Sequence, residues 1–237
     1  VREMQVYCEI YPWDADESRV MQIHPKAIIL SGGPASVYDE NAPSLQSFIL
    51  NSGLPILGIC YGMQLLVQNL GGRLASASAR EYGLAEIAQT ASNPLLPADS
   101  MTVWMSHGDR LESLPEGFSI YASSSNSPIS AIGNPDRKLY GIQFHPEVRH
   151  TPLGQQLLEN FVFKICNLHA DWTPDNIIDH SIKAIREQVG NNRVISAVSG
   201  GVDSSVATAL VYKAIRNQLD AIFVDTGLLR KNESSQV

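Results

Sequence analysis

The chain has 237 residues, of which 44% are hydrophobic and 17% are charged. This balance is typical of a globular protein and excludes an intrinsically disordered chain. The net charge of −7 argues against a broad surface for nucleic acid or for anionic membranes. Because no run of about 18 apolar residues occurs, we expect no membrane span.

The three cysteines, Cys8, Cys60 and Cys166, are an odd number, and none belongs to a CxxC pair. This spacing excludes a disulfide scaffold and a cysteine metal site. Reduced thiols are typical of the cytoplasm, which is the location that we expect. The sequence begins and ends inside a predicted pattern of elements, so we expect a fragment of a longer protein.

Short apolar runs that end at Gly or Pro alternate with helical patterns along the chain. Strands are predicted over residues 5–10, 27–30, 54–59, 101–105, 119–122, 138–144, 193–198 and 219–224. Helices are predicted over residues 61–70, 153–166, 174–189 and 206–217. This alternation predicts an α/β fold with a mostly parallel sheet.

The pattern starts again near residue 168. Thr173 followed by Pro174 predicts a helix N-cap, and a strand, a loop, a helix and a strand follow it. We therefore expect two domains, residues 1–167 and residues 168–237, with the second represented only by its first βαβ portion.

Cys60 lies at the end of a buried apolar run, between Gly58 and Gly62, and a helical pattern follows it. Small flanking residues permit the sharp strand-to-helix turn on which nucleophiles are presented. The N-terminus of a helix also favours the reactive thiolate. The alternative is a buried, inert cysteine, which is a common role for this residue type.

A second predicted strand ends in His145-Pro146-Glu147. A cysteine nucleophile needs a base, and the base needs an acceptor that orients it. His145 and Glu147 could fill these two roles; alternatively, they are a capping histidine and a solvated glutamate. Both candidate segments follow strand C-termini, where α/β sheets bind their ligands.

The segment Ser31-Gly32-Gly33-Pro34 follows another strand, and its glycines would let backbone N–H groups approach an oxyanion. A simple turn is the alternative. Taken together and in this order, SGGP, GICYG and FHPEV resemble the class I (triad) glutamine amidotransferase domain over about residues 1–167. The first strand of that family usually precedes the position of Val1 and is missing here.

This resemblance implies that Cys60 attacks the carboxamide of glutamine, that His145 transfers the proton and that Glu147 orients His145. It also implies an oxyanion hole from the N–H groups of Gly33 and Tyr61, and a glutamine contact at Gln64. The segment Ser106-His107-Gly108-Asp109 is similar to a family loop at the glutamine pocket, although a structural role for His107 is an equal alternative. Tyr82 could line a loop over the same pocket.

The loop SGGVDSS joins the strand near 193–198 to a helix, and it consists of Ser199, Gly200, Gly201, Val202, Asp203, Ser204 and Ser205. Its glycines, hydroxyl groups and helix N-terminus suit a pyrophosphate, and it lacks the lysine of a Walker loop. The alternative is a Gly-Ser turn in which Asp203 or Ser204 caps the helix.

This loop resembles the PP-loop of ATP pyrophosphatases, whose domain is adenine nucleotide alpha hydrolase-like. The resemblance implies ATP binding by the loop and Mg²⁺ at Asp203, directly or through water. The following segment FVDTGLLRKNE is also similar to that family, in which the strand near Phe223 lies beside the adenosine.

A glutaminase domain followed by a PP-loop domain resembles the family of glutamine-hydrolysing GMP synthetases. The resemblance implies the substrates glutamine, ATP and XMP, the release of AMP and pyrophosphate, and a homodimer formed through a C-terminal domain beyond residue 237. Two alternatives stay open: another PP-loop synthetase, such as NAD synthetase, and a non-catalytic module that keeps the fold.

Overall fold

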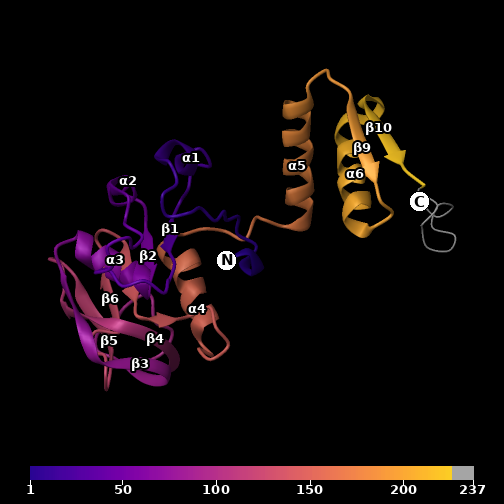
Figure 1. Ribbon diagram of the computed structural model, residues 1–237. Helices are drawn as coiled ribbons and strands as arrows, with labels where there is room; N and C mark the ends of the chain where they lie inside the picture. The colour runs from indigo at the N-terminus through magenta and orange to yellow at the C-terminus, as the bar shows by residue number, and fades with distance from the viewer. Residues whose placement is uncertain (226–237) are drawn as a thin grey trace. The chain divides into compact units, whose positions relative to one another are not determined.

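The computed structural model describes residues 1–225, except for the side chains of residues 76–80. The chain forms two compact units, Glu3–His169 and the part from Ala170 onward, and each is described by itself (Figure 1). Among the helices of residues 1–225, none is long and apolar enough to cross a membrane.

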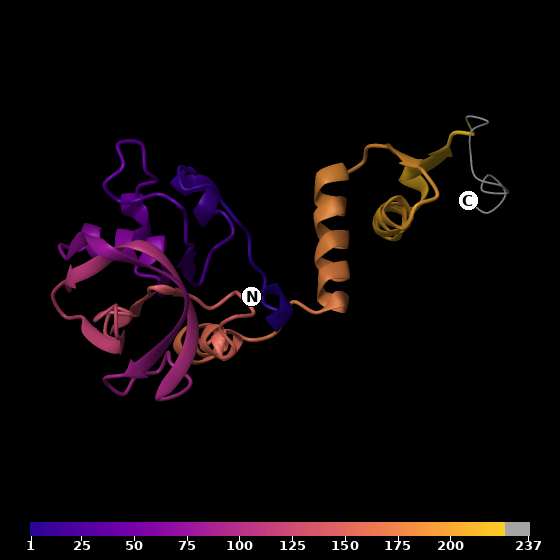
Figure 2. The same cartoon turned by 60° about the horizontal axis from the view of Figure 1, so that its bottom comes forward.

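The first unit is built on an eight-stranded sheet with the order β1-β2-β7-β6-β5-β3-β4-β8. Its strands are β1 (Ile28–Leu30), β2 (Ile56–Ile59), β3 (Arg73–Gln89), β4 (Ser100–Ser113), β5 (Ser119–Ser124), β6 (Ala131–Asn134), β7 (Leu139–Ile142) and β8 (Phe144–His145). Figure 2 shows how strongly the long strands of this unit curve.

The expectation of a mostly parallel sheet is wrong for the first unit, which has a mixed sheet. Only β1–β2 and β2–β7 pair in parallel, and the other five pairings are antiparallel. The reason lies in the connections: β5, β6 and β7 follow one another after short loops, and such loops can join only antiparallel neighbours. The parallel part of the sheet is confined to β1, β2 and β7, which lie around the elbow at Cys60.

Two sequence expectations about strands differ from the structure. Residues 6–10 form no strand, although Val6 is buried in the core. The long strand β3 and the short strand β6 were not expected, because alanine, serine and glycine in them weaken the strand signal.

The helices of the first unit are short. They are η1 (Arg2–Met4), α1 (Glu17–Met21), α2 (Ser47–Asn51), α3 (Tyr61–Asn69), α4 (Gly154–Glu159) and the π-helix η2 (Asn160–Ile165). The helix expected over 153–166 is therefore an α-helix that continues as a π-helix.

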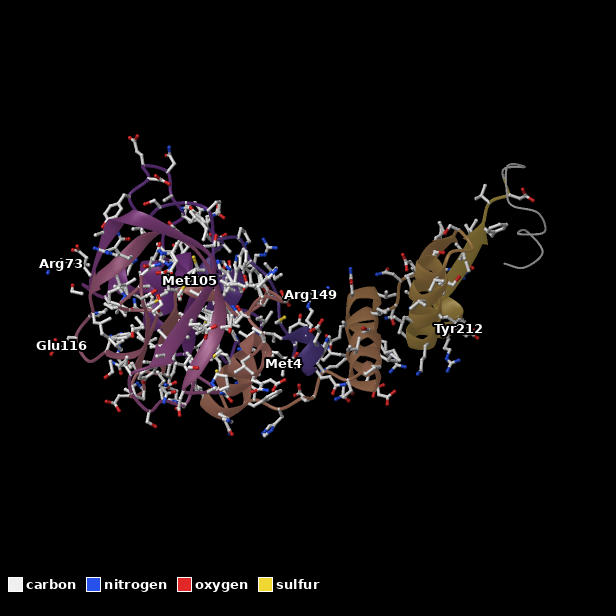
Figure 3. The ribbon with its side chains drawn as sticks, turned by 90° about the horizontal axis from the view of Figure 1, so that it is seen from below. Met4, Arg73, Met105, Glu116, Arg149 and Tyr212 are labelled. Carbon is white, nitrogen blue, oxygen red and sulfur yellow. The ribbon has the colours of Figure 1, made fainter. Side chains whose placement is uncertain are left out.

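The core of the first unit forms where α3 and the C-terminal helices pack on the sheet. All four residues of β2 are buried, and Met63, Leu66 and Val67 of α3 are fully buried. Figure 3 shows Met105 of β4 inside this unit, whereas Arg73 and Glu116 point outward. The elbow between β2 and α3 is therefore held by the best-packed part of the unit.

The second unit contains α5 (Pro174–Val189), β9 (Val194–Val198), α6 (Val202–Ile215), η3 (Arg216–Gln218) and β10 (Leu219–Phe223). Strands β9 and β10 pair directly and in parallel, and α6 connects them along the chain. This is the expected βαβ arrangement. The Thr173 hydroxyl accepts a hydrogen bond from the Asn176 N–H at 3.4 Å, as predicted for an N-cap. Ile182, Ala214 and Ile215 form the buried centre between α5 and α6.

Candidate active site

Cys60 forms a strained turn between β2 and α3. Its φ of 50° and ψ of −108° lie outside the regions that residues with a Cβ ordinarily adopt. Its N–H donates to the carbonyl of Ile142 at 2.7 Å, and its carbonyl accepts from the Gln64 N–H at 3.1 Å. The predicted sharp turn is present, and hydrogen bonds from the neighbouring strand and helix hold it.

The glycines on either side of Cys60 are required by close packing. A Cβ at Gly58 would lie 2.6 Å from the Met63 nitrogen, and one at Gly62 would lie 2.2 Å from the Leu30 carbonyl oxygen. Both distances are far below van der Waals contact with backbone atoms, which cannot move aside easily. The GxCxG pattern therefore reflects the approach of α3 to β1 and β2.

His145 lies beside Cys60 and is held by Glu147. The Nδ1 of His145 is 2.7 Å from Oε1 of Glu147, so the carboxylate fixes the proton on Nδ1 and leaves Nε2 for the thiol. Gly32 closes the same corner, because a Cβ there would lie 3.0 Å from Cε1 of His145 and 3.5 Å from Cβ of Cys60. The three residues expected to form a triad are thus brought together.

The electrostatics of this group favour a charged histidine. The hydrogen bond with Cys60, followed by the one with Glu147, raises the pKa of His145 to about 10 against the opposing effect of burial. Burial pushes the pKa of Glu147 upward, but its hydrogen bond to His145, a backbone hydrogen bond and the charge of His145 together hold that pKa below its ordinary value. An imidazolium is therefore stable between the sulfur and the carboxylate.

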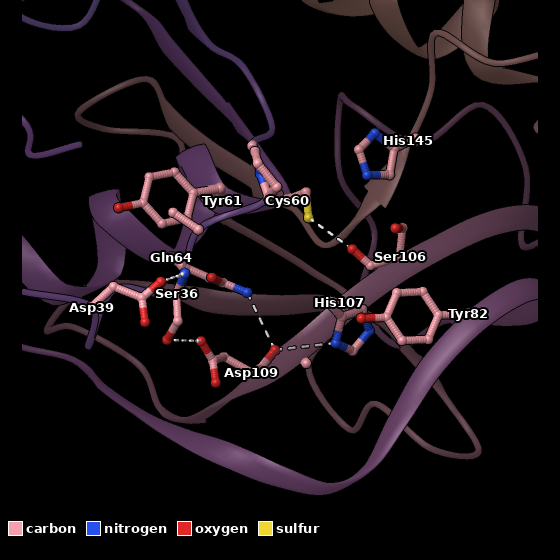
Figure 4. Close-up of a pocket in the computed structure, with 14 residues that line it drawn as sticks. Ser36, Asp39, Cys60, Tyr61, Gln64, Tyr82, Ser106, His107, Asp109 and His145 are labelled. Atoms are coloured by element: carbon pink, nitrogen blue, oxygen red, sulfur yellow. Dashed lines mark hydrogen bonds between the residues drawn. The ribbon is translucent and has the colours of Figure 1, made fainter. Parts of the chain in front are cut away.

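A cavity of about 650 Å³ opens in front of Cys60 (Figure 4). It is lined by Gly33, Pro34, Ala35, Ser36, Asp39, Cys60, Tyr61, Gln64, Tyr82, Ser106, His107, Gly108, Asp109 and His145. The expected oxyanion residues Gly33 and Tyr61 are neighbours, since a Cβ at Gly33 would lie 3.8 Å from the Tyr61 ring. Tyr61 is the first residue of α3, where the N–H has no acceptor within the helix.

Asp109 ties three segments together at the cavity wall. Its side chain accepts from the Ser36 hydroxyl at 2.5 Å, and its backbone carbonyl accepts from Nε2 of Gln64 at 3.2 Å. The predicted glutamine contact Gln64 is therefore anchored in the wall (Figure 4). The loop that contains Asp109 was expected at the pocket, whereas Ser36 has no sequence signal that points to it.

His107 forms a buried pair with Glu81 directly opposite it on β3. Nε2 of His107 lies 3.3 Å from Oε2 of Glu81, and Nδ1 lies 3.1 Å from the Asp109 carbonyl oxygen. Burial lowers the pKa of His107 despite the attraction of Glu81. Its ring holds the wall through the Asp109 carbonyl, which fits the structural alternative for this residue.

Two further residues contact the triad and were missed by sequence reasoning. Nε2 of Gln143 lies 3.6 Å from the sulfur of Cys60, and the Thr151 hydroxyl donates to the His145 carbonyl at 2.6 Å. Gln143 directly precedes the segment FHPEV, and Thr151 follows it after a short loop. Their proximity to motif residues was the only available signal.

In the second unit, the SGGVDSS loop enters α6 with Gly201 as the N-cap. The N–H of Ser199 donates to the Ser204 hydroxyl at 3.2 Å, and the hydroxyls of Ser204 and Ser205 donate to the Gly201 carbonyl at 3.1 and 2.9 Å. Gly201 occupies the N-cap position and Asp203 lies in the first turn of the helix, so neither Asp203 nor Ser204 is the N-cap residue.

The donors of this loop fit a polyphosphate. The first N–H groups of α6 have no acceptor within the helix, and the same loop carries the hydroxyl groups of Ser199, Ser204 and Ser205. A cavity of about 430 Å³ lies beside Gly200 and Ser205 and reaches Tyr212. Among residues 1–225 no group of three or more His, Cys, Asp or Glu side chains could hold a metal ion, so a cation at Asp203 would need oxygens from a ligand or water. Residues 226–233 of the segment FVDTGLLRKNE lie outside the described residues.

Comparison with curated proteins finds relatives along the whole chain. The chain is 53% identical over 240 residues to a protein from Thermomicrobium roseum named GMP synthase [glutamine-hydrolyzing], covering 100% of this chain and 45% of that protein. It is 50% identical to a protein of the same name from Caldanaerobacter subterraneus subsp. tengcongensis, covering 100% of this chain and 47% of that protein. The chain spans about half the length of the curated relatives it matches.

Solved structures and a family model agree on the first unit. A GMP synthase subunit from Thermoplasma acidophilum is similar with a TM-score of 0.58 and 30% identity, over 67% of this chain and 80% of that one. A glutamine amidotransferase from Thermotoga maritima shares the fold with a TM-score of 0.53 and 21% identity, over 60% of this chain and 79% of that one. The model described as glutamine amidotransferase class-I matches residues 1–165. The chain therefore belongs to the class-I glutamine amidotransferase family.

Proposed function

We propose that the first unit hydrolyses glutamine with Cys60 as the nucleophile, His145 as the acid and base, and Glu147 as the residue that orients His145. The observation that carries this proposal is that Cys60 and His145 line one cavity and meet at Gly32, while Nδ1 of His145 lies 2.7 Å from Oε1 of Glu147. A nucleophile, its base and an orienting acceptor in this order are the requirements for acyl transfer.

In the first step, the thiol proton of Cys60 passes to His145, and the sulfur bonds to the carboxamide carbon of glutamine. His145 gives a proton to the departing nitrogen, the C–N bond breaks, and ammonia leaves a γ-glutamyl thioester. His145 then takes a proton from water, whose oxygen attacks the thioester carbon. The C–S bond breaks, glutamate leaves, and the thiol is restored.

The proposed oxyanion donors are the N–H groups of Gly33 and Tyr61. Support comes from their adjacency at the cavity and from the position of Tyr61 at the start of α3. The Tyr61 hydroxyl donates to the Pro43 carbonyl at 2.6 Å, which keeps this side chain out of the reaction path. Such donors stabilise the negative charge that develops on the carbonyl oxygen.

The remainder of the cavity is suited to the polar end of glutamine. Gln64 lines it, and the carboxylates of Asp39 and Asp109 lie at the wall together with Ser36. We propose Gln64 as a glutamine contact and the two carboxylates as the acidic side that faces the substrate ammonium group.

We further propose that the second unit is the start of a PP-loop domain and that the longer protein is a GMP synthase. Two observations support this proposal: the names of the curated relatives and the phosphate-binding chemistry of the SGGVDSS loop. ATP would adenylate the 2-oxo group of XMP with release of pyrophosphate, and ammonia would displace AMP to give GMP. The same names favour XMP over deamido-NAD as the acceptor.

The proposed ligands of this second site are ATP on the loop from Ser199 to Ser205 and Mg²⁺ at Asp203. When bound, Mg²⁺ would offset negative charge on the leaving pyrophosphate. The cytoplasmic location and the homodimer stay predictions.

Glutamate release from glutamine by the purified protein tests the first proposal. We expect activity in the wild-type protein, its loss in Cys60→Ala, and its retention in Cys166→Ala, since Cys166 is partly buried against the core and does not line the cavity. Absence of glutaminase activity in the wild-type full-length protein with its synthetase substrates present would refute the proposal.

A further inference from the structure

We propose that Gln143 is a further catalytic residue of the glutaminase site, in which its carboxamide Nε2 donates a hydrogen bond to the sulfur of Cys60 and stabilises the thiolate. The inference deepens the proposed glutaminase function and rests on it. The predicted strand over residues 138–144 contains this residue, but no role was expected for it.

Gln143 is buried and held in a fixed position next to Cys60. It lies between β7 and β8, its side chain is 0% exposed, and its N–H donates to the Ser130 carbonyl at 2.9 Å. Its Nε2 is 3.6 Å from the sulfur, within hydrogen-bond distance for this large atom. A buried amide pays a desolvation cost unless its donors find acceptors, so the sulfur serves as its partner.

The orientation of the Gln143 amide follows from the hydrogen-bond network. The Asp109 carbonyl can only accept, so the Gln64 atom that faces it at 3.2 Å must be the NH₂ group. The same NH₂ group lies 3.4 Å from the Gln143 side chain, which must therefore present its oxygen. The NH₂ group of Gln143 is left to point at Cys60, and exchanging its oxygen and nitrogen would place two donors against each other.

Besides His145, two groups flank the sulfur, and they favour opposite protonation states of Cys60. The Ser106 carbonyl oxygen lies 3.5 Å from the sulfur and can accept only from a thiol. The Gln143 NH₂ group can donate, and a thiolate is a much stronger acceptor than a thiol. Ser106 therefore favours the neutral form of Cys60, whereas Gln143 favours the charged form without adding a charge of its own.

This arrangement connects the cavity wall to the nucleophile. Gln64 lines the cavity, and its NH₂ group also donates to the side-chain oxygen of Gln143. A substrate that contacts Gln64 is therefore connected through this one side chain to Gln143, which donates to the sulfur. The titratable side chains around the cavity are Asp39, Cys60, Tyr61, Tyr82, His107, Asp109 and His145, with Glu147 behind His145. Of these, His145 is the group whose ionisation is coupled to Cys60 by a hydrogen bond.

The pH dependence of Cys60 alkylation by iodoacetamide, followed on the Cys60 peptide by mass spectrometry, tests the proposal. Gln143→Met keeps the volume but removes the donor, and we expect the pH midpoint of alkylation to rise by about one unit, a tenfold change. Gln143→Glu places a carboxylate oxygen at the sulfur and should raise the midpoint further. Glutamine turnover should fall through kcat more than through KM.

Asn160→Leu is the matched control. Asn160 is also buried, and its amide donates to the Leu95 carbonyl at 2.9 Å instead of to a group of the site. This variant should lose stability without moving the midpoint. An unchanged midpoint in Gln143→Met, in a protein that still hydrolyses glutamine, would overturn the proposal while leaving the glutaminase function intact.

A second measurement does not depend on the folding of a variant at position 143. In the wild-type protein, the side-chain NH₂ resonance of Gln143 should shift with the same pH midpoint as alkylation, and this step should disappear in Cys60→Ala. An NH₂ resonance that does not respond to pH would contradict a hydrogen bond to the sulfur. Because neither readout requires turnover, an inactive wild-type protein would count against the glutaminase function alone.

Discussion

Nδ1 of His145 lies 2.7 Å from Oε1 of Glu147, only two residues further along the chain. The contact joins a side chain that is 18% exposed to one that is 52% exposed, so the acceptor lies half in solvent. Pro146 lies between the two residues at the end of β8 and restricts the backbone there. Glu147 can therefore orient the ring, and the sulfur at the other face has the larger effect on its protonation.

The protonation of His145 should depend on Cys60. Because the hydrogen bond with Cys60 is the largest cause of the raised pKa, Cys60→Ala should lower the pKa of His145 from about 10 toward its ordinary value of 6.5. An NMR titration of the His145 imidazole measures this shift, and the resonance that is absent in His145→Gln identifies the signal of His145. A pKa that is the same in both proteins would mean that the sulfur does not hold the imidazolium.

The same shift predicts a pH-dependent stability. A pKa raised on folding stabilises the fold fully below about pH 6.5, and the contribution is lost as the pH rises to about 10. The difference in free energy of unfolding between the wild type and His145→Gln should therefore shrink over this window. Urea denaturation at several pH values measures it, and a difference that grows with pH would have the wrong sign.

Gly62→Ala should destabilise the fold by roughly 1–3 kcal/mol or more, because its Cβ would lie 2.2 Å from the Leu30 carbonyl oxygen. Gly33→Ala is the control, since its Cβ would meet only the Tyr61 ring at an ordinary 3.8 Å. Thermal and chemical denaturation compare the two. Equal stability of both variants would contradict the packing account of the GxCxG pattern.

Thr151 is expected to position His145. Its hydroxyl, on a residue that is 3% exposed, donates to the His145 carbonyl at 2.6 Å and accepts from the Trp104 N–H at 3.0 Å. Thr151→Val removes both hydrogen bonds at similar volume and should lower kcat about tenfold with little change in KM. Thr151→Ser keeps the hydroxyl and should restore kcat, whereas equal losses in both variants would assign the effect to packing alone.

Asp203→Ala tests the separation of the two proposed sites in the full-length protein. The variant should lose ATP-dependent pyrophosphate release with ammonia as the nitrogen donor, because the proposed Mg²⁺ loses its carboxylate. Basal glutamate formation without ATP should remain, since it requires only the first unit. Normal pyrophosphate release would remove Asp203 from the nucleotide site.

The sequence predicted the parts of the site that depend on neighbouring residues in the chain. The elbow at Cys60 needs only a buried strand, two glycines and a helix, and His145 and Glu147 are separated by one proline. These local signals survive in the structure because all four residues of β2 are buried. The βαβ arrangement of the second unit was also predictable from local signals, since each of its elements follows the previous one directly in the chain.

Contacts between distant residues could not be predicted in this way. Gln143 and Cys60 are 83 positions apart, and their contact depends on the register between β2 and β7. The antiparallel part of the sheet depends on the pairing of β3 with both β4 and β5. The sequence of β3 is rich in alanine and serine and does not specify these partners. Ser36 and Asp109 likewise meet only after the sheet has formed.

Covalent capture by a glutamine analogue with an electrophilic carbon at the carboxamide position tests whether Cys60 is the nucleophile of a glutamine site. We expect one modification per chain, found by mass spectrometry on the Cys60 peptide, blocked by excess glutamine and strongly slowed in His145→Ala. Modification of Cys8 or Cys166 at an equal rate, or labelling that glutamine does not compete with, would contradict Cys60 as the nucleophile of a glutamine site.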